Sequence, residues 1–393
     1  MKMSQKSLKE YIEVMRQRYA GRGRAGRSRL LDELCVLGDF ERKYAIKVLR
    51  RQRRKKRASA RGKKSVRYGK EVQRVVEVIW RRSEQMCGKR LQPALPLWLP
   101  HYERHQGALS PEIRVKVLSI SAPQIDRLLA PCRARTRRKR LGGTRPGTLL
   151  RHQIPVRTEH WEIDRPGYLE ADTVAHGGES TSGDFIWSLT ATDIFSGWTE
   201  LRAVWNKGAH GVCGQIEAVE KALPFALLGF DCDNGSEFLN HHLWSYFGNG
   251  RRGVDFTRSR PYRKNDNAHV EQKNWTHVRC LLGYERLDHP ELVEEINRLY
   301  RGAWSELHNF FSPSLKLLEK KREGGKCRKR YEQARTPAQR LLAWSGLTPE
   351  ARAHLERLER ELDPFALKAS VERQLRDIFK LRRQIHATRQ EAA

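Results

Sequence analysis

The sequence predicts a multidomain α + α/β protein: helical N-terminal units, then a core with a mixed five-stranded sheet, then a helical C-terminal region. Up to about residue 133, apolar residues recur at helical spacing. From about residue 155 they form short runs bounded by turn residues, which is typical of strands. The 393 residues are enough for two or three domains.

Charge is distributed unevenly along the chain. Residues 1–150 contain 40 Lys and Arg against 12 Asp and Glu, a net charge of +28. Residues 151–300 have a net charge of −6, and residues 301–393 have +9. Basic surface neutralises phosphates and releases counterions, whereas carboxylates in the middle could collect metal. This pattern favours a nucleic-acid partner and disfavours a ribosomal protein, whose basic charge would be spread more evenly.

Cysteine spacing and hydropathy exclude further classes of protein. The seven cysteines are irregularly spaced and contain no CxxC pair, which argues against a disulfide framework and against a zinc finger. No apolar run is long enough for a membrane span, and no secretory signal opens the chain. We therefore expect an intracellular protein with no membrane partner.

The first predicted domain, residues 1–66, has three short helices followed by a basic arm. The third helix, residues 40–51, would turn Tyr44, Ala45, Val48 and Leu49 inward. Basic residues on another face suit the recognition helix of a helix-turn-helix, with a small helical bundle as the alternative. The arm should be disordered without a polyanion and lie along DNA. The expected DNA contacts are Lys43, Lys47, Arg50, Arg54, Lys55 and Lys56.

The second predicted domain, residues 67–150, is another helical unit with a basic linker. Helices are expected at 72–80, 113–118 and from Ser121 to Leu129, where Ser121 lies near the cap and Pro123 in the first turn. We interpret this unit as a second helix-turn-helix. The expected DNA contacts are Arg127 in the last of these helices and Arg137 and Arg138 in the linker.

The third predicted domain, residues 151–300, is the core that contains the five-stranded sheet. Three meandering strands followed by alternating helix and strand match an RNase H-like core. Residues 301–393 are expected to be mostly helical, with a basic connector at 320–330. The expected strands are 167–174, 184–193, 197–204, 226–231 and 253–258, and the expected helices are 209–225, 236–247 and 265–282.

Three carboxylates in separate local patterns mark the candidate site. Asp172 lies in the first strand, and Asp233 follows a buried strand where an Asn-Gly turn exposes it. Glu271 lies inside a helix that can lean across the carboxyl end of the sheet. Hard oxygen ligands favour Mg²⁺, with Mn²⁺ as a substitute, and two such ions suit attack on a phosphodiester.

Other carboxylates compete for these positions. Asp231 lies two residues before Asp233, but only Asp233 is followed by Asn-Gly. Asp266 lies five residues before Glu271, on a different helix face. Glu170 shares a strand face with Asp172 and could contribute. We interpret Asp193 as a structural residue at a strand end.

Three segments carry a family resemblance. They are Thr-Asp-Ile-Phe-Ser-Gly-Trp at 192–198, Asp-Asn-Gly-Ser-Glu-Phe at 233–238, and residues 267–274 around the glutamate. Residues 160–285 resemble the catalytic domain of the DDE transposase and retroviral integrase superfamily, especially bacterial insertion-sequence transposases with an integrase-type core. The resemblance implies a catalytic and metal-binding triad of Asp172, Asp233 and Glu271. Glu271 follows Asp233 by 38 residues, slightly more than is usual, so an insertion near residues 251–253 is expected.

The resemblance also implies an activity and its partners. The expected enzyme hydrolyses and transesterifies phosphodiesters with two Mg²⁺ ions, Asp172 bridging both, and so cuts and joins DNA. Its partners would be double-stranded DNA at the element's terminal inverted repeats and at the target, together with further copies of the chain. A cytoplasmic, nucleoid-associated protein of bacteria is expected.

The sequence allows alternatives for the DNA contacts near the cut and for the overall function. Arg263, Lys264 and Asn274 are predicted to contact DNA near the cut, with solvation of the helix surface as the alternative. Two other functions compete with transposition. One is an RNase H-like nuclease or resolvase without strand transfer, and the other is a catalytically silent DNA-binding regulator.

Overall fold

The structure is a computed structural model of the 393-residue chain. It describes residues 5–38, 40–50, 68–135, 163–233, 235, 237–238, 240–248, 253–258, 270, 273–323 and 326–391. The chain divides into two compact units, Met1–Arg67 and Tyr68–Ala393. The domain boundaries predicted near residues 150 and 300 both fall within the second unit.

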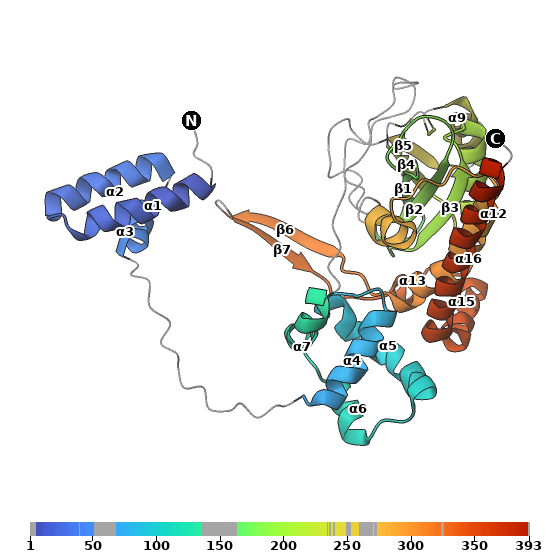
Figure 1. The fold of residues 1–393 in the computed structure, drawn as a ribbon, viewed down its shortest axis with the longest axis horizontal. Helices are drawn as coiled ribbons and strands as arrows, with labels where there is room; N and C mark the ends of the chain where they lie inside the picture. The colour runs from blue at the N-terminus through green and yellow to red at the C-terminus, as the bar shows by residue number, and fades with distance from the viewer. Residues whose placement is uncertain are drawn as a thin grey trace. The chain divides into compact units, whose positions relative to one another are not determined.

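The described part of the first unit consists of helices α1 (Gln5–Ala20), α2 (Arg24–Gly38) and α3 (Arg42–Arg50) (Figure 1). Its core contains Met15, Leu34, Ala45 and Leu49. The prediction that Tyr44 faces inward is wrong, because its side chain is 52% exposed. The buried positions of α3 are four residues apart, and Tyr44 lies outside that stripe. A helix-turn-helix role for this unit stays a prediction.

The second unit begins with four helices, α4 (Lys70–Arg82), α5 (Gly88–Gln106), α6 (Pro111–Leu118) and α7 (Ala122–Arg135). The sequence analysis did not identify α5, which contains Pro93, Pro96 and Pro100. Proline removes a backbone donor and disfavours a helix interior, so tertiary packing must hold this helix. Trp98 of α5 is fully buried and donates from Nε1 to the Phe311 carbonyl at 3.0 Å.

The predicted mixed five-stranded sheet is present, with its strands in the order β3-β2-β1-β4-β5. The first three strands form an antiparallel meander, and β4 and β5 run parallel to β1. This sheet with its flanking helices fits the predicted integrase-like core. The strands are β1 (Tyr168–Ala175), β2 (Ile186–Asp193), β3 (Thr199–Trp205), β4 (Gly229–Cys232) and β5 (Asp255–Arg258).

Helices cover both faces of this sheet. On one face, α8 (Ala209–Ala222) and α9 (His241–Gly248) pack on Leu169, Ala171 and Phe230. The prediction placed the start of α9 at residue 236, whereas the helix begins at His241. The side chain of Asn240 accepts from the Leu243 amide at 3.0 Å, as a residue at a helix start does.

The opposite face of the sheet packs on the C-terminal part of the chain. Only part of the long helix predicted at 265–282 is described: Val270 is helical, Asn274–Arg279 forms a π-helix (η1), and α11 (Cys280–Leu282) follows. The remaining helices are α12 (Leu292–Leu299), the π-helix η2 (Tyr300–Trp304), α13 (Ser305–Phe311), α14 (Pro337–Ala343), α15 (Pro349–Glu361) and α16 (Pro364–Glu391). Buried residues of α4, α5, α7, α12, α13 and α16 belong to one hydrophobic cluster with this face.

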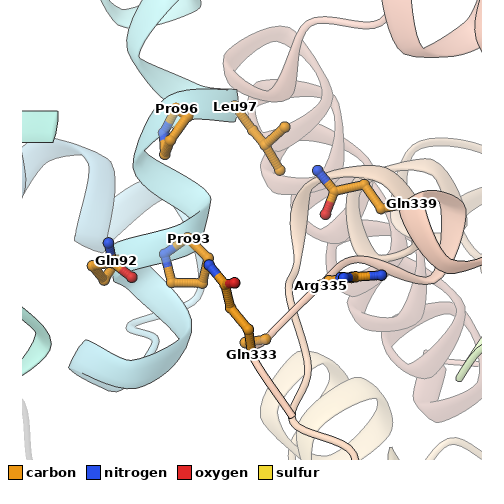
Figure 2. Close-up of a pocket in the computed structure, with 8 residues that line it drawn as sticks. Gln92, Pro93, Pro96, Leu97, Gln333, Arg335 and Gln339 are labelled. Carbon is orange, nitrogen blue, oxygen red and sulfur yellow. The ribbon is translucent and has the colours of Figure 1, made fainter. Parts of the chain in front are cut away.

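The prediction of a basic connector at 320–330 is wrong about its structure, because the segment contains strands. The chain there forms an antiparallel ribbon of β6 (Leu317–Glu323) and β7 (Lys326–Tyr331), separate from the five-stranded sheet (Figure 1). After β7, the segment leading to α14 lines a groove of about 410 Å³ with Pro93, Pro96 and Leu97 of α5 (Figure 2). Among the helices that the structure describes, none has the length and apolar character needed to span a membrane.

Candidate active site

Two of the three predicted carboxylates lie side by side at the centre of the sheet. Ala171 of β1 is paired with Cys232 of the parallel strand β4, so the next residues, Asp172 and Asp233, are neighbours across the two strands. Adjacent strands lie about 4.8 Å apart. The sheet therefore brings together two acidic residues that are 61 positions apart in the sequence.

Hydrogen bonds hold both carboxylates in place. For Asp172, Oδ1 accepts from the Thr173 amide at 2.7 Å, and Oδ2 accepts from the side-chain amide of Asn274 at 2.6 Å. For Asp233, Oδ1 accepts from the Gly235 amide at 2.8 Å. Gly235 belongs to the Asn-Gly dipeptide that distinguished Asp233 from Asp231 in the sequence.

The two carboxyl groups are hard to ionise together. Burial, followed by the charge of Asp233, raises the pKa of Asp172 to about 7. Burial, followed by the charge of Glu237, raises the pKa of Asp233 to about 6. Burial is the larger cause in both cases, so the ionised forms of these two carboxyl groups are poorly solvated. A divalent cation that prefers oxygen ligands fits such a site.

Glu237 is a site residue that the sequence analysis missed. Its side chain is buried, and it accepts from Thr173 Oγ1 at 2.8 Å and from Lys207 Nζ at 3.0 Å. The Lys207 ammonium also lies over the Trp187 ring, 4.5 Å from its centre. Only the place of Glu237 in the motif at 233–238 could have signalled it.

The Glu237 carboxylate lies against Gly235. A Cβ at Gly235 would lie 2.5 Å from a carboxylate oxygen of Glu237, closer than atoms approach without displacement. The turn after β4 thus allows Glu237 to lie against its backbone while the Gly235 amide holds Asp233. The glycine of the motif serves close packing of a second carboxylate.

The described residues on both sides of Glu271 contact β1. Val270 is fully buried, and its amide donates to Oε2 of Glu170 at 3.4 Å. The side-chain amide of Asn274 donates to Asp172, and its predicted contact with DNA stays a prediction. Lys273 donates to the Gly197 carbonyl at 3.3 Å, and burial, followed by Arg90 and Arg340, lowers its pKa to about 7.

The competing carboxylates have other surroundings. Asp231 is fully buried and accepts from Thr257 Oγ1 at 2.6 Å, and Glu170 is its paired neighbour on β1. Asp193 accepts from the Gly167 amide at 2.8 Å and from the Ser196 amide and hydroxyl at 2.7 and 2.6 Å. These bonds fix the end of β2 and the turn to β3, which is the structural role expected for Asp193.

Several predicted residues lie outside this cluster. Lys43, Lys47 and Arg50 are exposed on α3 in the first unit, and Arg127 is exposed on α7 in the second. Within the described residues, no three histidine, cysteine, aspartate or glutamate side chains are grouped closely enough to hold a metal ion. Glu271, Arg54, Lys55, Lys56, Arg137, Arg138, Arg263 and Lys264 fall outside the described part of the chain.

A comparison with curated proteins identifies a relative of similar length. The chain is 40% identical over 335 residues to the "Uncharacterized protein y4rM" of Sinorhizobium fredii, covering 84% of this chain and 94% of that protein. No family model matches the chain.

Two solved structures show weaker similarity. One is the catalytic core domain of BIV integrase, with 16% identity over 44% of this chain and 91% of that one, at a TM-score of 0.26. The other is a simian T-cell lymphotropic virus intasome in complex with PP2A regulatory subunit B56 gamma, with 12% identity over 53% of this chain and 66% of that one, at a TM-score of 0.29. Similarity at this level carries no functional argument, so function must be argued from the site itself.

Proposed function

Since the chain belongs to the same family as the y4rM protein of Sinorhizobium fredii, whose function is uncharacterized, we propose its activity from its own site. The proposed activity is metal-dependent cleavage and joining of DNA strands, as in a bacterial insertion-sequence transposase. The proposed catalytic residues are Asp172, Asp233 and Glu271. Phosphodiester hydrolysis would release a 3′-hydroxyl end, and transesterification would join that end to a target.

The closeness of Asp172, in β1, to Asp233, directly after the parallel strand β4, is the observation that carries this proposal. Burial raises the pKa of both groups, with a further rise from Asp233 at Asp172 and from Glu237 at Asp233, which supports a site that favours a bound cation. Residues on either side of Glu271 contact the same strand, which supports a third carboxylate at the same place. Two Mg²⁺ ions on these ligands, or Mn²⁺ in their place, would activate the nucleophile and stabilise the leaving oxygen.

The other residues of the site would position and balance these carboxylates. Asn274 orients Asp172 through its side-chain amide. Lys207 and Thr173 hold Glu237, whose charge lies close enough to raise the pKa of Asp233. The chain therefore has a rigid hydrogen-bonded support behind its proposed ligands, as precise in-line chemistry needs.

The proposed partner is double-stranded DNA, at the element's terminal inverted repeats and at the target. The net charge of +28 in residues 1–150 supports phosphate binding there. Lys43, Lys47 and Arg50 would contact the DNA from α3. Joining two ends requires two active sites, so we propose a homo-oligomer that acts in the cytoplasm on the bacterial nucleoid.

Substitution of Asp233 tests the assignment. Purified wild type and Asp233→Asn would be incubated with Mg²⁺, a duplex carrying the DNA that flanks the coding region, and a target plasmid. We expect the variant to bind DNA normally and to lose cleavage by about 10³-fold or more, since removing a metal ligand removes most transition-state stabilisation. Asp255→Asn, an exposed position at the start of β5, is the matched control and should cleave normally.

The products separate the alternatives. Joining of the 3′-hydroxyl end to the plasmid supports a transposase, whereas cleavage without joining indicates a nuclease or resolvase. Full activity of Asp233→Asn would disprove the site assignment. Absence of wild-type cleavage with intact DNA binding would favour a catalytically silent regulator.

A further inference from the structure

The β6–β7 ribbon is a strongly charged element outside the carboxylate site. Its two strands contain seven basic and two acidic residues, a net charge of +5. Basic residues occupy directly paired positions, Lys320 with Lys329 and Lys321 with Arg328. Like charges directly opposite each other destabilise a strand pair. The two acidic residues are also paired with basic ones, Glu319 with Arg330 and Glu323 with Lys326, and the excess charge of +5 is complementary to a polyanion.

The ribbon is exposed where the structure describes its side chains. Arg328, Lys329, Arg330 and Tyr331 of β7 are exposed, as is Leu318 of β6. Figure 1 shows the two strands extending away from the helices of their own unit. An isolated two-stranded hairpin is only marginally stable in water. A surface of this kind suits a partner that covers it.

Despite this exposure, the base of the ribbon is firmly attached to the core. The chain pairs again at Ser314 and Arg335, where the Ser314 amide donates to the Arg335 carbonyl at 2.8 Å. Arg340 donates to the Ser314 carbonyl at 2.6 Å and to the Ser196 carbonyl at 2.9 Å. Lys316 donates to the Phe195 carbonyl at 3.1 Å. The ribbon is thus fixed to the β2–β3 turn of the five-stranded sheet.

That same turn is linked to the candidate active site. Lys273 donates to the Gly197 carbonyl, and the next residue, Asn274, donates to Asp172. Through Ser196 and Gly197, the ribbon and the carboxylate pair share one rigid support. A nucleic acid bound to the ribbon would therefore have a fixed position relative to the candidate active site.

From these observations we propose that the β6–β7 ribbon is a DNA-binding arm that occupies the major groove of double-stranded DNA. The major groove of B-DNA is about 12 Å wide and admits a two-stranded ribbon. Seven residues of strand extend about 23 Å, enough to follow the groove for roughly seven base pairs. DNA binding by the ribbon does not depend on the proposed function. The inference rests on that function in one respect, namely that the bound DNA is the substrate of the core.

Other nucleic acids fit the ribbon less well. Duplex RNA has a deep, narrow major groove that side chains cannot enter. Single strands are bound largely by stacking bases on aromatic rings, and Tyr331 is the one aromatic residue in β6 and β7. Basic charge in a two-stranded ribbon without a row of aromatic rings is complementary to duplex phosphates and groove edges.

The test compares two triple variants of the full chain that lose the same charge. The ribbon variant is Arg328→Gln, Lys329→Gln and Arg330→Gln. The control variant is Arg373→Gln, Arg376→Gln and Lys380→Gln, at exposed positions of α16. Affinity for a random-sequence DNA duplex of about three helical turns would be measured between 50 and 200 mM salt in EDTA.

Three phosphate contacts change the slope of log K against log salt by about 2.7. Between 50 and 200 mM salt, the wild type should therefore lose about forty-fold more affinity than the ribbon variant. The control variant should keep the wild-type slope. A wild-type slope in the ribbon variant, or an equal loss in the control, would overturn the proposal.

Two further measurements locate the contact and separate the hypotheses. Methylation of guanine N7, an atom of the major groove, should interfere with wild-type binding and not with binding by the ribbon variant. Equal ribbon dependence on an RNA duplex of the same sequence would contradict major-groove binding. Because EDTA prevents metal-dependent cleavage, ribbon-dependent binding without any cleavage in Mg²⁺ would refute the proposed function and leave the DNA-binding arm standing.

Discussion

The side-chain amide of Asn274 donates to the carboxylate of Asp172 at 2.6 Å, joining residues 102 positions apart. Asn274 opens the π-helix η1, and Asp172 lies in the central strand β1. Asn274 Oδ1 is buried and accepts no hydrogen bond from the residues that the structure describes. The contact with Asp172 is therefore the hydrogen bond that fixes the orientation of this amide, and it opposes the rise in the pKa of Asp172 that burial causes.

Replacing Asn274 with alanine should slow Mg²⁺-dependent cleavage by about 10- to 100-fold. A hydrogen bond to a charged group is worth about 1.5–3 kcal/mol, and without it the pKa of Asp172 should rise further. The acidic limb of the pH–rate profile should consequently move to higher pH. Cleavage rates between pH 5 and 9 would be compared with those of Cys280→Ser, an exposed position in α11. An unchanged profile would mean that β1 alone positions Asp172.

Substitutions of Glu237 and Lys207 should shift the pH–rate profile of cleavage in opposite directions. The charge of Glu237 raises the pKa of Asp233, whereas the charge of Lys207 lowers it. Glu237→Gln should thus move the acidic limb of cleavage to lower pH, and Lys207→Met should move it to higher pH. The rates would be measured at saturating Mg²⁺ for both variants. Shifts in the same direction would show that the pair acts through the fold and not through charge.

The contribution of Asp172 to the stability of the metal-free protein should fall as the pH rises from about 4 to about 7. The pKa of Asp172 is raised from 3.8 to about 7, so the folded protein holds a proton that the unfolded chain releases. One pKa unit corresponds to about 1.4 kcal/mol, so the contribution is at most about 4 kcal/mol and less where water reaches the carboxylate.

Asp172→Asn isolates this contribution from that of the other carboxylates. Urea unfolding in EDTA at pH 4.5 and pH 7.5 should show a smaller loss of unfolding free energy in the variant than in the wild type. Added Mg²⁺ should raise the stability of the wild type most at pH 7.5, where the carboxylates are ionised. A pH dependence identical in the two proteins would contradict the raised pKa of Asp172.

Arg340→Met should destabilise the second unit by about 3 kcal/mol. The arginine is only 7% exposed and pairs with Glu332 at 2.5 Å, and removing one partner leaves the other charge poorly compensated. Arg298→Met, which removes an exposed pair with Glu295, should cost less than about 1 kcal/mol. Unfolding free energies measured in urea would compare the two.

A double variant shows whether the loss of stability in Arg340→Met comes from the unpaired charge of Glu332. Adding Glu332→Met to Arg340→Met should recover part of the lost stability, because no uncompensated charge then remains. If the double variant were less stable than Arg340→Met by the full cost of a second independent substitution, the Arg340 bonds to the Ser196 and Ser314 carbonyls would account for the effect.

The strands of the core were predictable because each has a local signal. β1 to β5 carry apolar runs bounded by glycine and polar turns, and each overlaps its predicted range. The β6–β7 ribbon has no such signal, since charged residues fill most of its positions and backbone pairing alone defines it. The three prolines of α5 likewise hide a helix that depends on contacts with distant residues such as Phe311.

The site was predictable where motif and strand order coincide. A carboxylate in β1 and another just after β4 must meet if the two strands are neighbours. Spacing does not show which of several acidic residues in a short motif is turned inward, so Glu237 was missed. Lys207 follows β3 outside any motif and reaches Glu237 only because the chain folds back.

The hydrophobic cluster shared by α4, α5 and α7 with α12, α13 and α16 has a consequence for protein synthesis. About 200 residues separate the end of α5 from the start of α13, so at 5–20 residues per second the ribosome needs roughly 10–40 s to complete the partner surface. Throughout that interval the face of α5 around Trp98 lacks its partners Phe311 and Phe365, although α4 and α7 are already present, and a proline-containing helix is weakened without such contacts. Nascent chains stalled before residue 305 should thus bind chaperones through α5 and be released once α13 and α16 emerge.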